Sequence, residues 1–357
     1  MIRLFLILVL VTFVTYFLFT RIIPTAKQTL DKVSFKVEAQ LPKVNFETIF
    51  ANDHSQVNSL PKDKLITVIA TGDVIPARSV NYQSAVRKNF LWPYEKTSGF
   101  IADADITFIN LETPLLQNCP LTQEGMIFCG SDRHIEGLVG SGIDVVSLAN
   151  NHAGNWGQKG VEETADLLES NRILVTGIKR GYVLYEVKGI KFAFLGYSDI
   201  EKNEIVSKAE EDIIRQEIAQ AKKAADVVIV TFHWGAEYKS QPDKRQISLG
   251  HQAIDSGADL IIGNHPHWIQ PVEIYKDKLI TYAHGNFIFD QEWSENTKLG
   301  VVGKYTFYGS NLVEVEYFPV RIIDYGQPYF LESLEKQKIL DEMKNESLIL
   351  SRSSLSE

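Results

Sequence analysis

Residues 144–157 of the chain read DVVSLANNHAGNWG, and this stretch is the most informative about the fold. Its first part, Asp144–Ala149, is an apolar run with the length and composition of a buried strand. Two amides and an imidazole follow at once, Asn150, Asn151 and His152, and then a glycine-rich turn. Polar side chains at this place predict a ligand site, because ligands bind at the carboxyl ends of strands in parallel α/β sheets.

The same pattern, an apolar run followed by side chains able to bind a metal ion, recurs along the chain. The other stretches are TVIATGD (67–73), ITFINLE (106–112), VVIVTFHWG (227–235), LIIGNHPHW (260–268) and LITYAHGN (279–286). Five of the eight histidines fall at these strand ends: His152, His233, His265, His267 and His284. The loops after neighbouring parallel strands converge, so we expect these side chains to meet in one crevice.

From residue 64 onward, short β-branched runs alternate with amphipathic stretches, which predicts an α/β domain. The predicted strands are Leu65–Ala70, Ile106–Asn110, Asp144–Ala149, Phe192–Tyr197, Asp226–Phe232, Asp259–Gly263, Leu279–His284 and Leu312–Tyr317. The predicted helices are Gly160–Ser170, Ser207–Ala225, Arg245–Ser256 and a peripheral one over Phe330–Leu350. The strand-rich part from Leu279 to Tyr325 indicates an additional antiparallel portion.

The N-terminus predicts a membrane anchor. Leu4–Thr20 is uncharged, mostly apolar and about as long as the shortest spanning helices, and no small-residue cleavage site follows it. We therefore expect a transmembrane signal-anchor over residues 1–23, a juxtamembrane linker over 24–63, the α/β domain over 64–325 and a C-terminal helix and tail over 326–357. Flanking charges do not set the orientation. We expect a single-pass cell-membrane protein with its large domain outside the cytoplasm.

Composition narrows the partners. The formal net charge of −9 argues against nucleic acid, because domains that bind it usually carry a basic face. The only two cysteines, Cys119 and Cys129, lie in one loop-like stretch and are equally consistent with a small disulfide loop or two thiols. A zinc site built on cysteine is disfavoured, because no second pair exists.

Taken singly, each polar group has a structural explanation: Asp73 could cap a helix beginning near Pro76, and His233 could be a hydrogen-bonded core histidine. Taken together, carboxylates, an amide and several imidazoles at converging strand ends favour a metal site. Mixed imidazole and carboxylate ligands suit Mn, Zn or Fe. Two such ions about 4 Å apart would activate a water and clamp phosphoryl oxygens, while a free imidazole would protonate the leaving oxygen.

Six ordered motifs between Leu65 and Tyr325 resemble the CapA-type bacterial capsule-synthesis family, which is associated with poly-γ-glutamate capsules. They are TGDVIPAR, FINLETPL, DVVSLANNHAGNWG, TFHWGAEY, IGNHPHWIQPVE and YAHGNFIFDQ. That family is in turn similar to the calcineurin-like metallophosphoesterases, which implies a four-layer α/β/β/α sandwich with a site for one or two divalent metal ions.

The resemblance implies a role for individual residues. The implied metal ligands are Asp73, Glu112, Asn151, His233, His265 and His267, and His152 is the implied general acid. The residues expected to contact substrate or to hold the ligands in place are Arg78, Asn110, Glu237, His284 and Asn286. Ile75 stands where the metallophosphoesterases have a ligating histidine, and Glu112 replaces their bridging aspartate, so one metal position is short of a ligand. Trp156, Trp234 and Trp268 adjoin the site, and we expect them to pack around it.

The sequence therefore predicts a membrane-anchored, metal-dependent hydrolase of cell-surface polymer synthesis, of the phosphoesterase type. Its substrate would be a phosphoester, or an amide of poly-γ-glutamate. The alternative is a non-catalytic subunit that binds or exports an anionic polymer within a capsule synthase complex.

Overall fold

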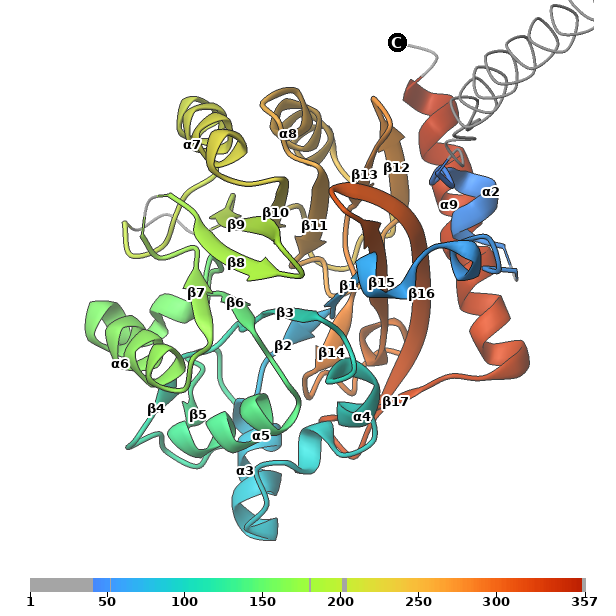
Figure 1. Ribbon diagram of the computed structural model, residues 1–357. Coiled ribbons are helices and arrows are strands. Elements are labelled where there is room, and N and C mark those ends of the chain that lie inside the picture. The colour runs from blue at the N-terminus through green and yellow to red at the C-terminus, as the bar shows by residue number, and fades with distance from the viewer. Residues whose placement is uncertain (1–40, 52, 180, 201–203, 355–357) are drawn as a thin grey trace, which may run out of the picture. The chain divides into compact units, whose positions relative to one another are not determined.

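Two β-sheets form the centre of the molecule (Figure 1). The computed structural model describes residues 41–51, 53–179, 181–200 and 204–354. Within these residues the first sheet has seven strands in the order β17-β16-β15-β1-β3-β6-β7. Their bounds, in chain order, are β1 Leu65–Ala70, β3 Ile106–Asn110, β6 Val145–Ser147, β7 Leu174–Thr176, β15 Leu299–Tyr308, β16 Asn311–Ile323 and β17 Gln327–Phe330.

The second sheet has six strands in the order β12-β13-β11-β10-β9-β8. Their bounds are β8 Val183–Val187, β9 Ile190–Ser198, β10 Val227–His233, β11 Leu260–Asn264, β12 Val272–Tyr275 and β13 Lys278–Thr281. Two short strand pairs lie apart from the sheets: β2 (Asp73–Val74) with β14 (Asn286–Ile288), and β4 (Leu115–Leu116) with β5 (Gly130–Ser131).

The middle of each sheet is parallel. Strands β1, β3, β6 and β7 run parallel in the first sheet, and β9, β10, β11 and β13 do so in the second. Every residue of β3 and of β10 is buried, as parallel strands covered on both faces require. Strand β15 pairs antiparallel with both β1 and β16, which confirms the antiparallel portion predicted for this part of the chain.

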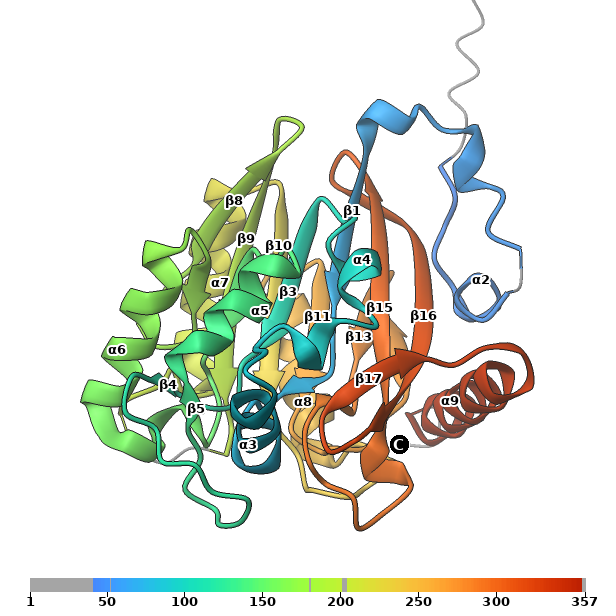
Figure 2. The ribbon, with the colours of Figure 1, turned by 90° about the horizontal axis from the view of Figure 1, so that it is seen from below.

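The sheets pack face to face, and helices cover their outer faces. Ile66 and Val68 of the first sheet share one apolar core with Phe194 and Ile229 of the second. The opposite face of the first sheet packs against α5 (Ile135–Gly140) and α6 (Gly157–Ser170), and that of the second against α7 (Glu211–Ala224) and α8 (Lys244–Asp255). The arrangement is therefore helix, sheet, sheet, helix, and the predicted α/β class is confirmed (Figures 1 and 2).

The remaining helices lie at the periphery. Helix α9 (Ser333–Ser354) contacts β12 and β16 at one edge, and α2 (Phe46–Ile49) also contacts β16 (Figures 1 and 2). Phe46 and Phe50 pack against the core between the sheets, although they fall in the segment expected to be a linker. Helices α3 (Arg78–Arg87) and α4 (Ser98–Ile101) lie on the connection from β2 to β3.

Helix starts differ from the sequence prediction for identifiable reasons. Helix α7 begins at Glu211 instead of Ser207, because Lys208 forms a bridge with Ser198 at the end of β9. Helix α9 begins after Phe330, which completes β17 by pairing with Val320. Strand β13 ends at Thr281 and does not reach His284. Of the strands in the two sheets, β7, β8, β12, β15 and β17 were not predicted.

No helix among the described residues is long and apolar enough to cross a membrane. The predicted span, Leu4–Thr20, lies outside those residues, so the membrane anchor stays a prediction.

Candidate metal centre

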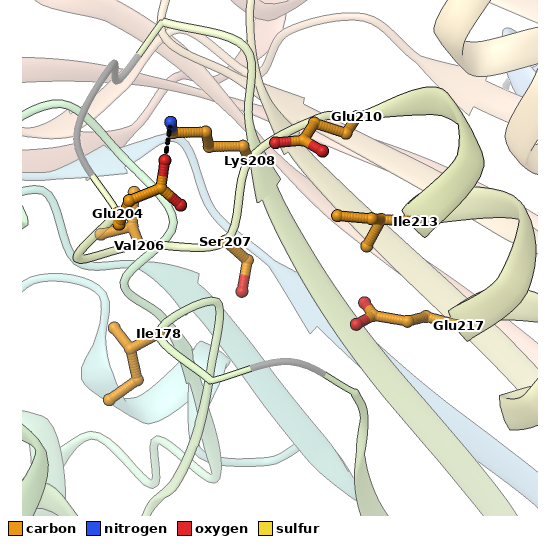
Figure 3. A pocket seen from close by; sticks show the side chains of 8 residues that line it. All are labelled: Ile178, Glu204, Val206, Ser207, Lys208, Glu210, Ile213 and Glu217. Carbon is orange, nitrogen blue, oxygen red and sulfur yellow. Dashed lines mark hydrogen bonds and ion pairs between the residues drawn. The ribbon is translucent and has the colours of Figure 1, made fainter.

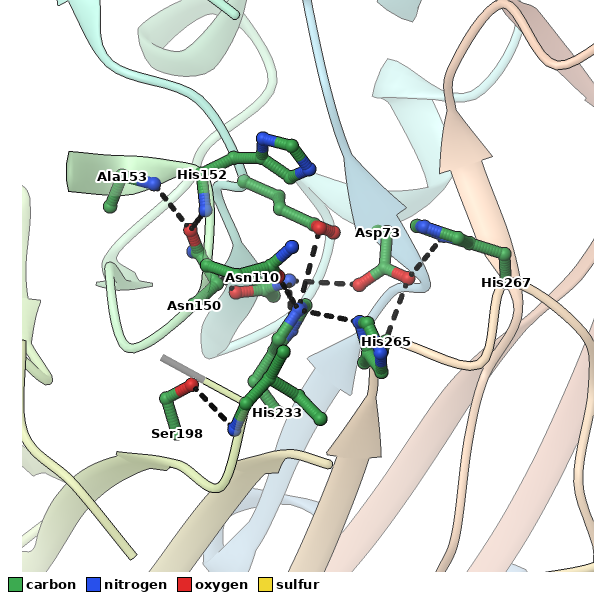
Figure 4. A network of polar contacts seen from close by, with 12 residues as sticks. Asp73, Asn110, Asn150, His152, Ala153, Ser198, His233, His265 and His267 are labelled. Atoms are coloured by element: carbon green, nitrogen blue, oxygen red, sulfur yellow. Dashed lines mark hydrogen bonds and ion pairs between the residues drawn. The ribbon is translucent and has the colours of Figure 1, made fainter. Parts of the chain in front are cut away.

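The carboxyl ends of the parallel strands bring the predicted ligands together from both sheets (Figure 4). Asp73 opens β2 directly after β1, Glu112 follows β3, and Asn151 follows β6 on the side of the first sheet. His233 is the last residue of β10, and His265 follows β11, on the side of the second sheet. The convergence expected from the strand-end pattern is present.

Three groups of ligand atoms lie within 4.8 Å of one another inside each group. The groups are Glu112 with His233 and His265, Asp73 with Glu112 and His267, and Glu237 with His265 and His267. Glu112 belongs to the first two groups, and we call these two groups the first and second half of the centre. Apart from the half-buried Glu237, all members are buried.

Contacts in the first half converge on one ring nitrogen. Asn151 Oδ1 lies 2.7 Å from His233 Nε2, His265 Nδ1 lies 3.1 Å from the same nitrogen, and Glu112 Oε1 lies 3.4 Å from it. One imidazole nitrogen carries at most one proton and donates at most one hydrogen bond, so His233 Nε2 cannot donate to all three neighbouring atoms at once. A divalent cation bound by these atoms would serve all of them.

Glu112 tests whether the residues fit a cation. Its side chain is fully buried, and neither carboxylate oxygen has a hydrogen-bond partner among the described residues. Burial, with the nearby Asp73 charge, raises the pKa of Glu112 well above its ordinary value. A buried carboxyl group without partners is costly for the fold, whereas coordination to a cation would compensate both oxygens. The centre therefore fits a cation.

The second half contains an ion pair. Asp73 Oδ2 lies 3.2 Å from His267 Nδ1, and Asn286 Oδ1 lies 2.9 Å from the same nitrogen. Burial opposes the charge on His267, but the hydrogen bond to Asp73 and the negative charges of Glu112, Asp73 and Glu237 together outweigh it and raise the pKa of His267 to about 9. Burial lowers the pKa of His233 to about 3 and that of His265 well below its ordinary value, so both are neutral.

The backbone around the histidine pair is strained. His265 has φ 98° and His267 has φ 58°, in the left-handed region that non-glycine residues seldom adopt, and Pro266 stands between them. A Cβ at the preceding Gly263 would lie 1.9 Å from the carbonyl oxygen of Tyr282, so only glycine lets β11 approach that segment so closely. Tight packing holds the two imidazoles at this end of the sheet.

The side chain of Asn150 stabilises the turn that follows β6. Its Oδ1 accepts hydrogen bonds from the backbone N–H groups of His152 and Ala153, and its Nδ2 donates to Asn110 Oδ1. Asn110 in turn donates to Asp73 Oδ1 over 2.8 Å. Asn150 and Asn110 therefore fix the ligand-bearing loops of the first sheet relative to each other.

His152 lies beside the centre and is mostly buried. Its Nδ1 is 3.0 Å from Asn155 Oδ1, and its ring stacks on Phe128 with the centroids 4.0 Å apart. Burial lowers the pKa of His152 to about 4. Neither Asn155 nor Phe128 was predicted. Asn155 could have been found from its place three residues after His152, whereas nothing in the local sequence singles out Phe128.

Three further residues that were predicted for the site have different contacts. Asn286 contacts His267 and donates to Thr297 O, so it holds the predicted ligand His267 in place. The Arg78 guanidinium forms an ion pair with Asp290, whose side chain is only 3% exposed and which the sequence did not reveal as a partner. His284 is fully buried, with Nε2 2.9 Å from Tyr305 Oη, so it belongs to an interior polar network and not to a substrate surface.

The tryptophans and cysteines have structural roles. Trp234 is fully buried, stacks on Phe232 and donates to Tyr282 O. Trp156 donates to Phe128 O, although 42% of its surface is exposed. Cys119 and Cys129 form a disulfide, which resolves the alternative that the sequence left open.

A separate hollow lies near the start of α7 (Figure 3). It is lined by Ile178, Glu204, Val206, Ser207, Lys208, Glu210, Ile213 and Glu217. Lys208 forms an ion pair with Glu204, and the Glu217 carboxylate accepts hydrogen bonds from Tyr197 Oη and Gly181 N. Its lining includes none of the predicted site residues.

The chain matches a known protein family and has sequence relatives in Bacillus. Residues 67–291 match the family described as bacterial capsule synthesis protein, and the chain belongs to this family. It is 27% identical over 357 residues to the PGA biosynthesis protein CapA of Bacillus subtilis, covering 92% of this chain and 91% of that protein. It is 25% identical over 308 residues to the capsule biosynthesis protein CapA of Bacillus anthracis, covering 80% and 74%.

A solved 5′-nucleotidase from Candida albicans is similar in structure, with a TM-score of 0.41 and 11% sequence identity, covering 89% of this chain and 60% of the nucleotidase.

Proposed function

We propose that this member of the capsule-synthesis family is a divalent-metal hydrolase of the phosphoesterase type. The observation that carries the proposal is Glu112, whose buried and unpartnered carboxylate lies between two groups of histidines. A purely structural role does not account for a carboxyl group in this position, because an apolar side chain would be cheaper to bury.

The residues of the two halves would hold one or two ions. Asn151, His233, His265 and Glu112 supply the ligand atoms of the first half, and Asp73, Glu112 and His267 those of the second. This mixture of imidazole, amide and carboxylate favours Mn, Zn or Fe. When bound, such ions lower the pKa of a coordinated water and neutralise phosphoryl oxygens.

His152 would move the proton of the leaving group. Asn155 Oδ1 accepts a hydrogen bond from Phe128 N, so it acts as an acceptor and the proton of neutral His152 lies on Nδ1. Nε2 is therefore the nitrogen open to substrate. A bound phosphoester brings negative charge, which favours protonation of Nε2, and the imidazolium then donates this proton to the leaving oxygen.

We further propose that Leu4–Thr20 anchors the chain as a single-pass membrane protein with the hydrolase domain outside the cytoplasm. The Cys119–Cys129 disulfide supports this placement, because disulfides persist in oxidising compartments. There the domain would act on an anionic surface polymer or a phosphoester precursor of it, beside subunits of a capsule synthase. Labelling of a cysteine introduced in the exposed loop 121–127 with a membrane-impermeant thiol reagent, on intact cells, tests the placement.

The purified full chain tests the catalytic proposal. We expect bound Mn, Zn or Fe and hydrolysis of generic phosphodiesters that falls by about 10²–10⁴-fold in kcat in His152→Ala, with the metal content unchanged. Absence of metal after loading with each ion would overturn the proposal. Bound metal without any turnover that depends on His152 would instead support a polymer-binding or export subunit, and binding of poly-γ-glutamate would then be measured.

A further inference from the structure

A loop closed by a disulfide borders the metal centre. The Cys119–Cys129 bond joins residues ten positions apart. Cys129 and Phe128 are buried, whereas the side chains of Leu121, Met126 and Ile127 are more than half exposed. The loop therefore extends into solvent, and Phe128 is its buried contact on the side of the centre.

Phe128 fixes His152 in two ways. Its ring stacks on the imidazole at a centroid distance of 4.0 Å and an angle of 20°. Its backbone N–H donates to Asn155 Oδ1 over 2.7 Å, and the same oxygen lies 3.0 Å from His152 Nδ1. The plane of the imidazole and the partner of its Nδ1 both depend on this one residue.

Contacts on the other side hold Phe128 in turn. The Arg78 guanidinium carbon lies 4.8 Å from the Phe128 ring centroid, and Arg78 Nη1 donates to Gly125 O over 3.2 Å. Trp156 Nε1 donates to Phe128 O over 3.0 Å. Arg78 is itself fixed by Asp290. Phe128 thus contacts both His152 and an arginine that is held by an ion pair with a distant part of the chain.

We propose that the disulfide-closed loop 119–129 is a positioning element for His152, and that Phe128 is its positioning residue. Without the disulfide, ordering this exposed loop costs more conformational entropy, and the buried Phe128 ring with the hydrogen bonds to Arg78, Trp156 and Asn155 offsets only part of that cost. Opening the disulfide therefore lowers turnover by the centre without removing its metal. The effect on turnover rests on the proposed hydrolase function, whereas the effect on the His152 side chain does not.

Reduction of the disulfide is a complete reaction with a phosphine reductant. The S–S bond accepts two electrons and two protons and becomes the Cys119 and Cys129 thiols, while the phosphine takes the oxygen of one water and becomes a phosphine oxide. The double variant Cys119→Ser/Cys129→Ser reaches the open loop without any reductant. Treating this variant with the phosphine as well reports any direct effect of the reagent on the metal.

The test uses the full chain as wild type, as Phe128→Ala and as the double serine variant, with Ile127→Ala as the matched control because its side chain is 71% exposed. We expect kcat to fall about ten- to a hundredfold in Phe128→Ala and in the double serine variant, because small misplacements of a catalytic group lower the rate by this much. KM and metal content should stay near wild type. Diethyl pyrocarbonate, which acylates neutral imidazoles, should modify His152 faster in both variants, and His54 at the same rate in all proteins.

The outcomes separate this proposal from the proposed function. If no phosphoester is hydrolysed but His152 is modified faster in both variants, the positioning role stands and the hydrolase proposal fails. If modification of His152 and kcat both stay at wild-type values in Phe128→Ala and in the double variant, the positioning role is overturned. Should Phe128→Ala not fold, the double variant and the reduced wild-type protein decide in the same way.

Discussion

The two halves of the metal centre share Glu112 but differ in how complete they are. In the first half, Asn151 and two neutral histidines from different strands lie beside the carboxylate, which would give a bound ion four ligands. In the second half, Asp73 and His267 already pair with each other, and Ile75, the position that the sequence analysis found to lack a ligand, is buried among apolar groups. Divalent ions of this kind favour at least four ligands. We therefore expect the first half to bind its ion more tightly than the second.

Changing the shared residue has the largest expected effect. Glu112→Gln should remove metal from both halves and lower hydrolysis about a thousandfold or more, because bound metal supplies several kcal/mol of transition-state stabilisation. Metal content and kcat/KM measure this. The metal-free variant should unfold at no lower temperature than the metal-free wild type, because the Glu112 carboxylate has no hydrogen bond to lose within the part of the chain that the structure describes. A much lower melting temperature would show that Glu112 stabilises the fold instead.

A matched pair of variants separates the halves. His233→Ala should release the tightly bound ion, whereas Asp73→Asn should release only the weaker one. We expect the affinity of the affected half to fall by more than the 10–100-fold that is usual for residues beyond the ligands. Calorimetric titration of the metal-free protein measures both affinities. Equal loss in the two variants would contradict the ranking of the halves.

Glu237 should have a smaller effect. Its carboxylate lies within 4.8 Å of ligand atoms of His265 and His267, and it is more exposed than the other members of the cluster. We expect Glu237→Gln to weaken both halves about tenfold, because Glu237 lies beside one histidine of each half. The same titration measures it, and Glu186→Gln on the exposed side of β8 is the control. An unchanged affinity would remove Glu237 from the centre.

His134 is a buried histidine outside the metal centre, and its pKa is shifted in the opposite direction to that of His267. Burial and, to a lesser extent, the Arg133 charge lower its pKa to about 3, whereas Asp73 helps to raise the pKa of His267. The unfolded chain takes up a proton below about pH 6.5 and the folded chain does not, so stability is lost as the pH falls toward 3. We expect this histidine to cost about 2 kcal/mol between pH 7 and pH 5, and His134→Gln to abolish that share. Denaturant unfolding at both values measures it, and equal pH dependence in both proteins would contradict it.

Much of the centre could be predicted because most of its residues directly follow a predicted strand in the sequence. A ligand at the end of an apolar run is visible in the sequence, and parallel strands bring such ends together without further information. His284 obeyed the same pattern but faces the interior, because β13 ends early and the chain turns toward Tyr305. Asp290 and Phe128 escaped prediction because their roles depend on contacts across distant parts of the chain, with Arg78 and with His152.

The strand order of the first sheet has a consequence for synthesis. Strand β1 pairs on one side with β3, which follows soon after it, and on the other with β15, which is made only after the whole second sheet. During translation the β15 edge of β1 therefore stays open for most of the chain, and open edges recruit other strands. Leu299–Tyr308 is thus the segment that ends this exposure, and a ribosome that stops before it leaves a nascent chain prone to aggregation.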